Sequence, residues 1–71
     1  MNARTELVEA RENVIRAALD VLVAERALSD EKASAQAVMD AEERLALASR
    51  SLARAVDALP TGRRPRGWGQ Q

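Results

Sequence analysis

Large apolar residues recur every seven positions in both halves of the chain. In the first half they are Leu7, Val14, Val21 and Leu28, and in the second they are Val38, Leu45, Leu52 and Leu59. Alanine occupies a second position of the same heptads, namely Ala3, Ala10, Ala17, Ala24, Ala41, Ala48 and Ala55. Two apolar positions per heptad are typical of α-helices that pack along one seam. The pattern therefore predicts an all-α protein.

A first helix is predicted over residues 5–28. Asn2 or Thr5 can cap it, because either side chain can accept a hydrogen bond from a free backbone N–H at the helix start. Glu6 follows in the first turn, where a negative charge is favourable next to the helix dipole. Neither glycine nor proline interrupts this segment, so the heptad pattern runs through it without a break.

A second helix is predicted over residues 30–59. Ser29 and Asp30 are suitable caps for its start, and Pro60 ends it, because the residue before a proline is driven out of the helical conformation. No glycine or proline enforces the turn between the two helices, so one continuous helix is an alternative. We favour a break because Glu31 stands where the heptad requires a large apolar residue.

The spacing also predicts how the two helices pack. Folding the chain back at Glu31 places Leu7 opposite Ala55, and the same register places Val14 opposite Ala48. Every layer then pairs a large residue with an alanine, which fills the space between the helices evenly. The expected fold is an antiparallel two-helix hairpin over residues 1–59, followed by a tail.

One flank of this seam is predicted to be apolar as well, and the other to be polar. The candidate protein-binding residues on the apolar flank are Val8, Ile15, Leu19, Leu22, Met39 and Val56. Arg11 and Glu42 interrupt this flank; they either pair across a dimer or extend their charged ends into water. An apolar face of this extent indicates an interaction site. A second copy would complete a helical bundle there, and docking on another protein is the alternative.

Composition excludes most chemistry. The 71 residues include no Cys, His or Tyr, which removes disulfides, thiolate metal sites and the commonest general base. We expect no enzyme, cofactor, metal or small-molecule substrate.

A chain this short rarely builds a sufficient core alone, so we expect association with protein. No apolar run is long enough to span a membrane, which predicts a cytoplasmic protein or one within an intracellularly assembled particle.

Residues 60–71 are predicted to form a short, extended, basic tail. Residues 1–59 carry eight basic and eleven acidic side chains, a balance of −3, whereas the tail carries three arginines and no acid. The candidate anchor residues are Arg63, Arg64, Arg66 and Trp68. Trp and Arg are the residue types that most often dominate protein interfaces. The same arginines could instead contact phosphate, with Trp68 stacking on a base.

These features predict a non-enzymatic structural or adaptor protein, such as a small component of a bacterial or phage particle. It would associate through the apolar flank and be anchored to a larger assembly by its tail. The alternative is a small dimeric accessory protein that binds nucleic acid, and a third hypothesis is a regulator that sequesters a partner's helix. The Ala/Leu heptad occurs in many unrelated helical proteins, so it identifies an architecture only.

Overall fold

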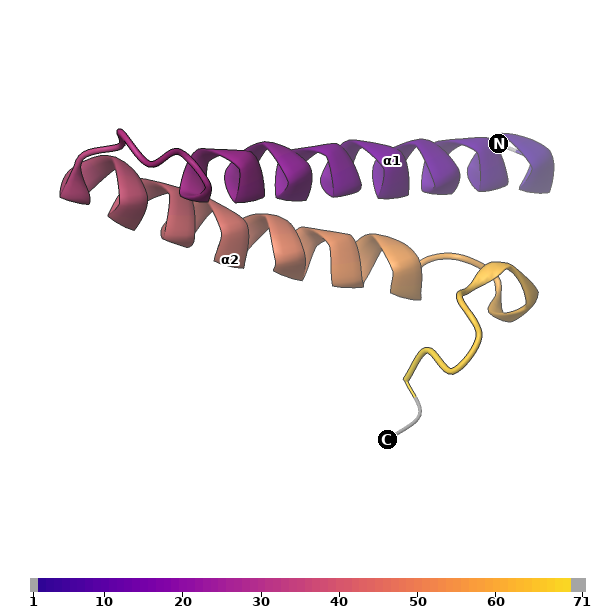
Figure 1. The fold of residues 1–71 in the computed structure, drawn as a ribbon. Coiled ribbons are helices and arrows are strands. Elements are labelled where there is room, and N and C mark those ends of the chain that lie inside the picture. Colours follow the sequence, from indigo (N-terminus) through magenta and orange to yellow (C-terminus); the bar gives the residue numbers. More distant parts are fainter. Residues whose placement is uncertain (1, 70–71) are drawn as a thin grey trace.

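The computed structural model of the protein describes residues 2–69 and is all-helical within that range. It contains two α-helices, α1 (Ala3–Leu28) and α2 (Ala35–Asp57), and the short 3₁₀ helix η1 (Thr61–Arg63). The second helix runs back along the first, with the turn at one end and the tail at the other (Figure 1). The prediction of two helices packed against each other is confirmed, and a break separates them.

The first helix begins two residues earlier than predicted. The backbone N–H of Thr5 donates to Asn2 Oδ1 at 2.8 Å, so Asn2 is the cap. At the other end, the hydroxyl of Ser29 donates to the backbone carbonyl of Glu25 at 3.1 Å. The same carbonyl also accepts the backbone N–H of Ser29 at 3.1 Å, so two bonds from Ser29 close the last turn, and the helix ends at Leu28 as predicted.

The second helix begins at Ala35, so the predicted start at Asp30 is wrong. The Asp30 carboxylate accepts a hydrogen bond from the backbone N–H of Lys32 at 3.0 Å, which stabilises a turn instead of a helix start. The cap is Ser34, whose hydroxyl accepts from the N–H of Ala37 at 3.1 Å. The connection is therefore longer than expected, and it covers the six residues from 29 to 34.

The predicted seam is the face along which the helices pack. From Leu7 to Leu59, every large heptad residue and every heptad alanine is buried or half-buried, whereas Ala3 is exposed. The most enclosed residues are Ala17, Ala24, Ala41, Val56 and Leu59. No large side chain among the described residues is fully enclosed, because two helices cover each other on one side only. The core of this hairpin is consequently thin.

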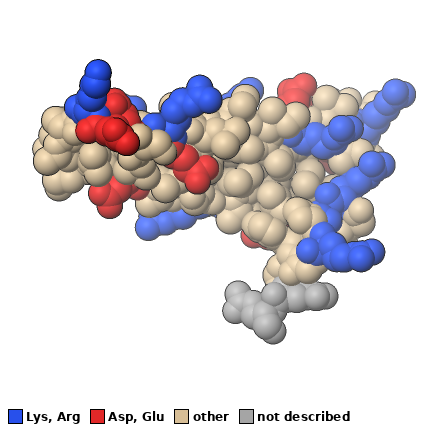
Figure 2. Space-filling view, in the orientation of Figure 1, with Lys and Arg blue, Asp and Glu red and all other residues tan. Residues whose placement is uncertain are grey.

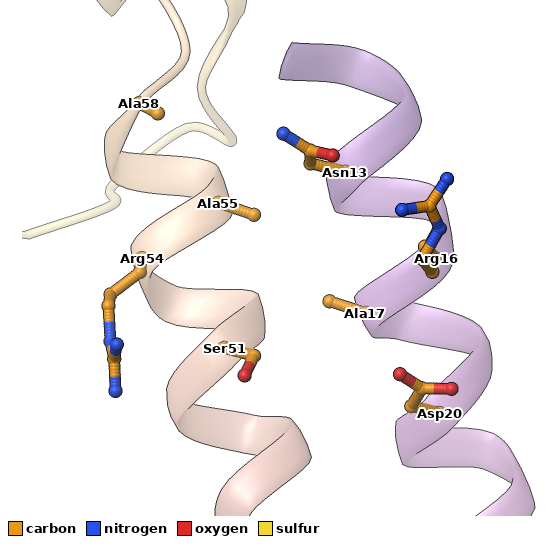
Figure 3. A pocket seen from close by; sticks show the side chains of 8 residues that line it. All are labelled: Asn13, Arg16, Ala17, Asp20, Ser51, Arg54, Ala55 and Ala58. Atoms are coloured by element: carbon orange, nitrogen blue, oxygen red, sulfur yellow. The ribbon is translucent and has the colours of Figure 1, made fainter. Parts of the chain in front are cut away.

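The register of the seam differs from the predicted one by about one heptad. Ala17 faces Ser51 and Ala55 (Figure 3), whereas the sequence placed it opposite Leu45. Ala24 correspondingly lines a groove with Ala48. The reason is that the pattern repeats every seven residues, so a shift of one heptad again pairs large residues with alanines. At the turn, α2 begins beyond the end of α1 (Figure 1), as the shifted register requires.

Candidate protein-interaction surface

Four large apolar side chains form a row on the outside of α1. Val8, Ile15, Leu19 and Leu22 are 46%, 57%, 55% and 59% exposed. Their spacings of seven, four and three residues place them on one side of a helix. From Val8 to Leu22 the row extends about 21 Å, at ~1.5 Å per residue. We call these four residues the outer α1 face.

The outer α1 face cannot be covered by α2. Ile15 and Leu22 each come one residue after a seam residue, Val14 and Val21. One residue corresponds to a rotation of about 100° around a helix, so these side chains point away from the seam. The helix is thus apolar on two sides, and the hairpin uses one of them.

Charged residues border the outer α1 face. Arg26 lines a shallow depression with Leu19 and Leu22, and Arg11 and Glu12 line another with Val8 and Ile15. The methylene stems of such side chains add apolar area while their charged ends stay in water. An apolar centre with a charged border is the usual arrangement of a protein–protein interface.

The two candidate residues on α2 differ from each other. Met39 is exposed near the turn, whereas Val56 is only 4% exposed, so the assignment of Val56 to the accessible flank is corrected. Val56 follows Leu52 by four residues and therefore lies on nearly the same side of α2 as the seam. At the open end of the hairpin, the residues that follow α2 also lie next to α1, where Leu59 lines a depression with Val14. Val56 belongs to the core.

The sequence reading missed two exposed apolar residues, Val23 and Leu47, on the flank expected to be polar. They line a groove with Asp20, Ala24, Arg44, Ala48 and Ser51. Val23 also lines the depression that contains Leu19, Leu22 and Arg26, so it lies between this groove and the outer α1 face. The remainder of this flank matches the expectation, because Asn13, Arg16 and Arg54 line an open groove (Figure 3).

The tail is folded against the end of α2 and is not extended as predicted. The Arg64 guanidinium donates to the backbone carbonyl of Leu59 from Nε, at 2.9 Å, and to that of Asp57 from Nη2, at 2.8 Å. These bonds satisfy carbonyl groups at and just beyond the helix end, where a positive charge is also favourable. Arg64 thus acts as a C-terminal cap supplied from the tail.

Trp68 makes a second contact with the same helix end. Its indole Nε1–H donates to Asp57 Oδ1 at 2.6 Å, and its backbone N–H donates to the carbonyl of Pro65 at 3.1 Å. Gly67, with φ of +82°, provides the turn conformation that other residues rarely adopt. Trp68 is still 38% exposed, so part of its side chain is accessible to a partner.

The four candidate anchor residues therefore divide into two pairs. Arg64 and Trp68 bind their own helix end, whereas Arg63 and Arg66 are exposed. The sequence offered no sign of this division, because the contact joins residues seven and eleven positions apart across a proline. Only the three-dimensional path of the tail brings these groups together.

Residues 2–69 bring together no group of three or more acidic side chains that could hold a metal ion. Neither α-helix of this part has both the length and the apolar composition of a membrane-spanning helix. No family model, curated protein or solved structure matches the chain. A proposal about function therefore rests on the surface of the hairpin.

Proposed function

We propose that this chain is a non-enzymatic structural or adaptor protein that associates with protein through the outer α1 face. The observation that carries the proposal is the row of four large apolar side chains, each about half exposed, on a helix whose other apolar side already packs on α2. Single exposed apolar residues are ordinary on protein surfaces, but a continuous row marks an interaction site.

The tail supports the adaptor part of this proposal. It presents Arg63, Arg66 and part of the Trp68 ring at the open end of the hairpin, and Arg and Trp side chains supply much of the binding energy in known interfaces. In this proposal the tail anchors the hairpin to a larger assembly, such as a bacterial or phage particle.

Nucleic-acid binding is the second candidate, and the exposed Arg63 and Arg66 favour it. Against it, Arg64 is occupied by two backbone carbonyls. The two candidates respond differently to salt. Phosphate binding weakens steeply as salt rises, whereas association through an apolar face changes little, so binding measured at low and high salt separates them.

The proposal is tested by site-specific photo-crosslinking in the native cells. A photoreactive residue replaces Leu19 in one variant and Arg50, an exposed residue of α2, in the matched control. We expect covalent protein adducts from position 19 and few from position 50. Equal labelling from both positions would show that the outer α1 face is ordinary surface and would overturn the proposal.

A double substitution, Leu19→Glu with Leu22→Glu, provides a second test of the proposed association. Both residues are exposed, so the hairpin should keep its helical circular dichroism, but two carboxylates on the outer α1 face should abolish association. Association that persists in this variant, measured as adducts from a photoreactive residue at Ile15, would contradict the proposal.

A further inference from the structure

Charge is distributed unevenly along the hairpin. Residues 20–49, which form the turn end, carry seven acidic and three basic side chains, a balance of −4. Residues 2–19 and 50–69, which form the open end, carry eight basic and four acidic side chains, a balance of +4. Figure 2 shows blue side chains gathered over the open end and most of the red ones toward the turn. The molecule has an acidic end and a basic end.

This distribution is self-complementary. Two copies that lie side by side in opposite directions place each acidic end next to the basic end of the other copy. Copies that lie in the same direction place like charges together. Because complementary potentials favour association and like charges oppose it, the charges select an antiparallel pair, which is also the arrangement that a two-fold axis perpendicular to the helices generates.

Along one edge of the outer α1 face, individual residues show the same pairing of opposite charges. Arg11, Ala18 and Glu25 are spaced by seven, so they lie on one edge of α1, and both charged residues are exposed. When two α1 helices pack antiparallel about Ala18, Arg11 of one copy lies beside Glu25 of the other. The symmetry repeats this pair, which gives two ion pairs.

The apolar residues fit the same register. Ile15 of one copy then packs against Leu19 of the other at the centre, and Val8 lies beside the aliphatic stem of Arg26. On the opposite edge, Arg16 lines the polar groove of its own hairpin together with Asp20 (Figure 3).

We propose that the partner of the outer α1 face is a second copy of this chain. The two α1 helices pack antiparallel about a two-fold axis near Ala18, with reciprocal ion pairs between Arg11 and Glu25. The result is a four-helix assembly with the two α1 helices at its centre. This inference rests on the proposed function, because it names the partner of the same surface.

Cysteine crosslinking of the purified full chain tests the geometry, because the natural chain contains no cysteine. Ala18→Cys places one thiol near the axis, next to the thiol of the second copy. Arg4→Cys lies on the same edge of α1 but far from the axis, and is the matched control. Under mild oxidation we expect a disulfide-linked dimer from A18C and little from R4C. Equal crosslinking of both variants, which a parallel pair would give, overturns the proposal.

Charge reversal provides an independent test. The dissociation constant of the dimer, measured by sedimentation at low salt, should rise about tenfold for R11E and similarly for E25R. The double variant R11E/E25R exchanges the two charges and should restore the dissociation constant to near its original value. Arg50→Glu makes the same change in net charge on the exposed side of α2 and should have little effect. A double variant as weak as the single ones overturns the assigned pairing.

The two proposals can fail separately. If light scattering shows a monomer at all concentrations while the photoreactive residue at position 19 still forms adducts with a different protein, the outer α1 face is an interaction site but its partner is not a second copy. If the chain is monomeric and position 19 forms no adducts, both proposals fail.

Discussion

At the scale of single residues, the ends of the helices depend on short polar contacts. Asn2 and Ser34 cap the two starts, and Arg64 caps the end of α2 from outside the helix. The first two are local, since the side chain and the N–H that it binds are three residues apart. The Arg64 contact reaches further, because the chain must turn at Pro60 before the guanidinium meets the last turn.

Replacing Arg64 tests whether this contact orders the tail. Arg64→Ala removes two charge-assisted hydrogen bonds and should lower the free energy of unfolding by about 1 kcal/mol, as measured by urea denaturation. The fluorescence of Trp68, the single tryptophan, should at the same time become more accessible to a soluble quencher. Arg66→Ala is the control, because Arg66 is exposed. Equal quenching in both variants would mean that Arg64 does not hold the tail.

At the scale of elements, each helix is defined by where its cap lies and by which side packs. A serine or aspartate in a polar stretch is a candidate cap, and the stretch between α1 and α2 contains three of them: Ser29, Asp30 and Ser34. The structure assigns them three different roles: Ser29 closes α1, Asp30 stabilises the turn, and Ser34 starts α2. The choice depends on the path of the connection, which a local pattern does not contain.

Substituting these serines distinguishes the observed start of α2 from the predicted one. Ser34→Ala removes the cap and should cost about 1 kcal/mol of stability. Ser29→Ala, at the predicted start, should cost less, because α1 still has its other backbone hydrogen bonds. Thermal unfolding followed by circular dichroism gives both values. A larger loss for S29A would indicate that the helix begins nearer to Asp30.

The close approach of α1 and α2 depends on the alanines of the seam. Ala24→Leu adds three carbons at a position that is only 2% exposed, and we expect a loss of about 1–3 kcal/mol from overpacking. Ala27→Leu is the matched control on the exposed side of the same helix. The measurement compares the free energies of unfolding of the two variants in urea. Similar values for the two variants would show that the seam has room for larger side chains.

At the scale of the whole molecule, the hairpin is a thin core with a second apolar side. Within residues 2–69, the well-enclosed side chains are those of three alanines, Val56 and Leu59, and the other large seam residues are half-buried. A chain of this size buries a smaller fraction of its surface on folding than a larger domain does. Burying the outer α1 face against a second copy would add to that fraction, so association and folding should be linked.

This linkage predicts a melting temperature that depends on concentration. For a chain whose stability comes partly from dimerisation, the midpoint of thermal unfolding rises with protein concentration. We expect a rise over a hundredfold range of concentration for the natural chain, and none for the variant with Leu19→Glu and Leu22→Glu. Circular dichroism in cells of different path length covers this range. A midpoint independent of concentration in the natural chain would indicate a hairpin that is stable without a second copy.

The sequence by itself determined that there are two helices, and which residues form the seam and the row of apolar residues on α1, because heptad spacing is a local property that fixes which side of a helix a residue lies on. It did not determine the register, since a pattern that repeats every seven residues looks the same after a shift of seven. Tertiary structure decided this by placing the start of α2 beyond the end of α1. It also placed Val56 in the core and Arg64 on the end of α2, because both outcomes depend on where the chain travels after Pro60.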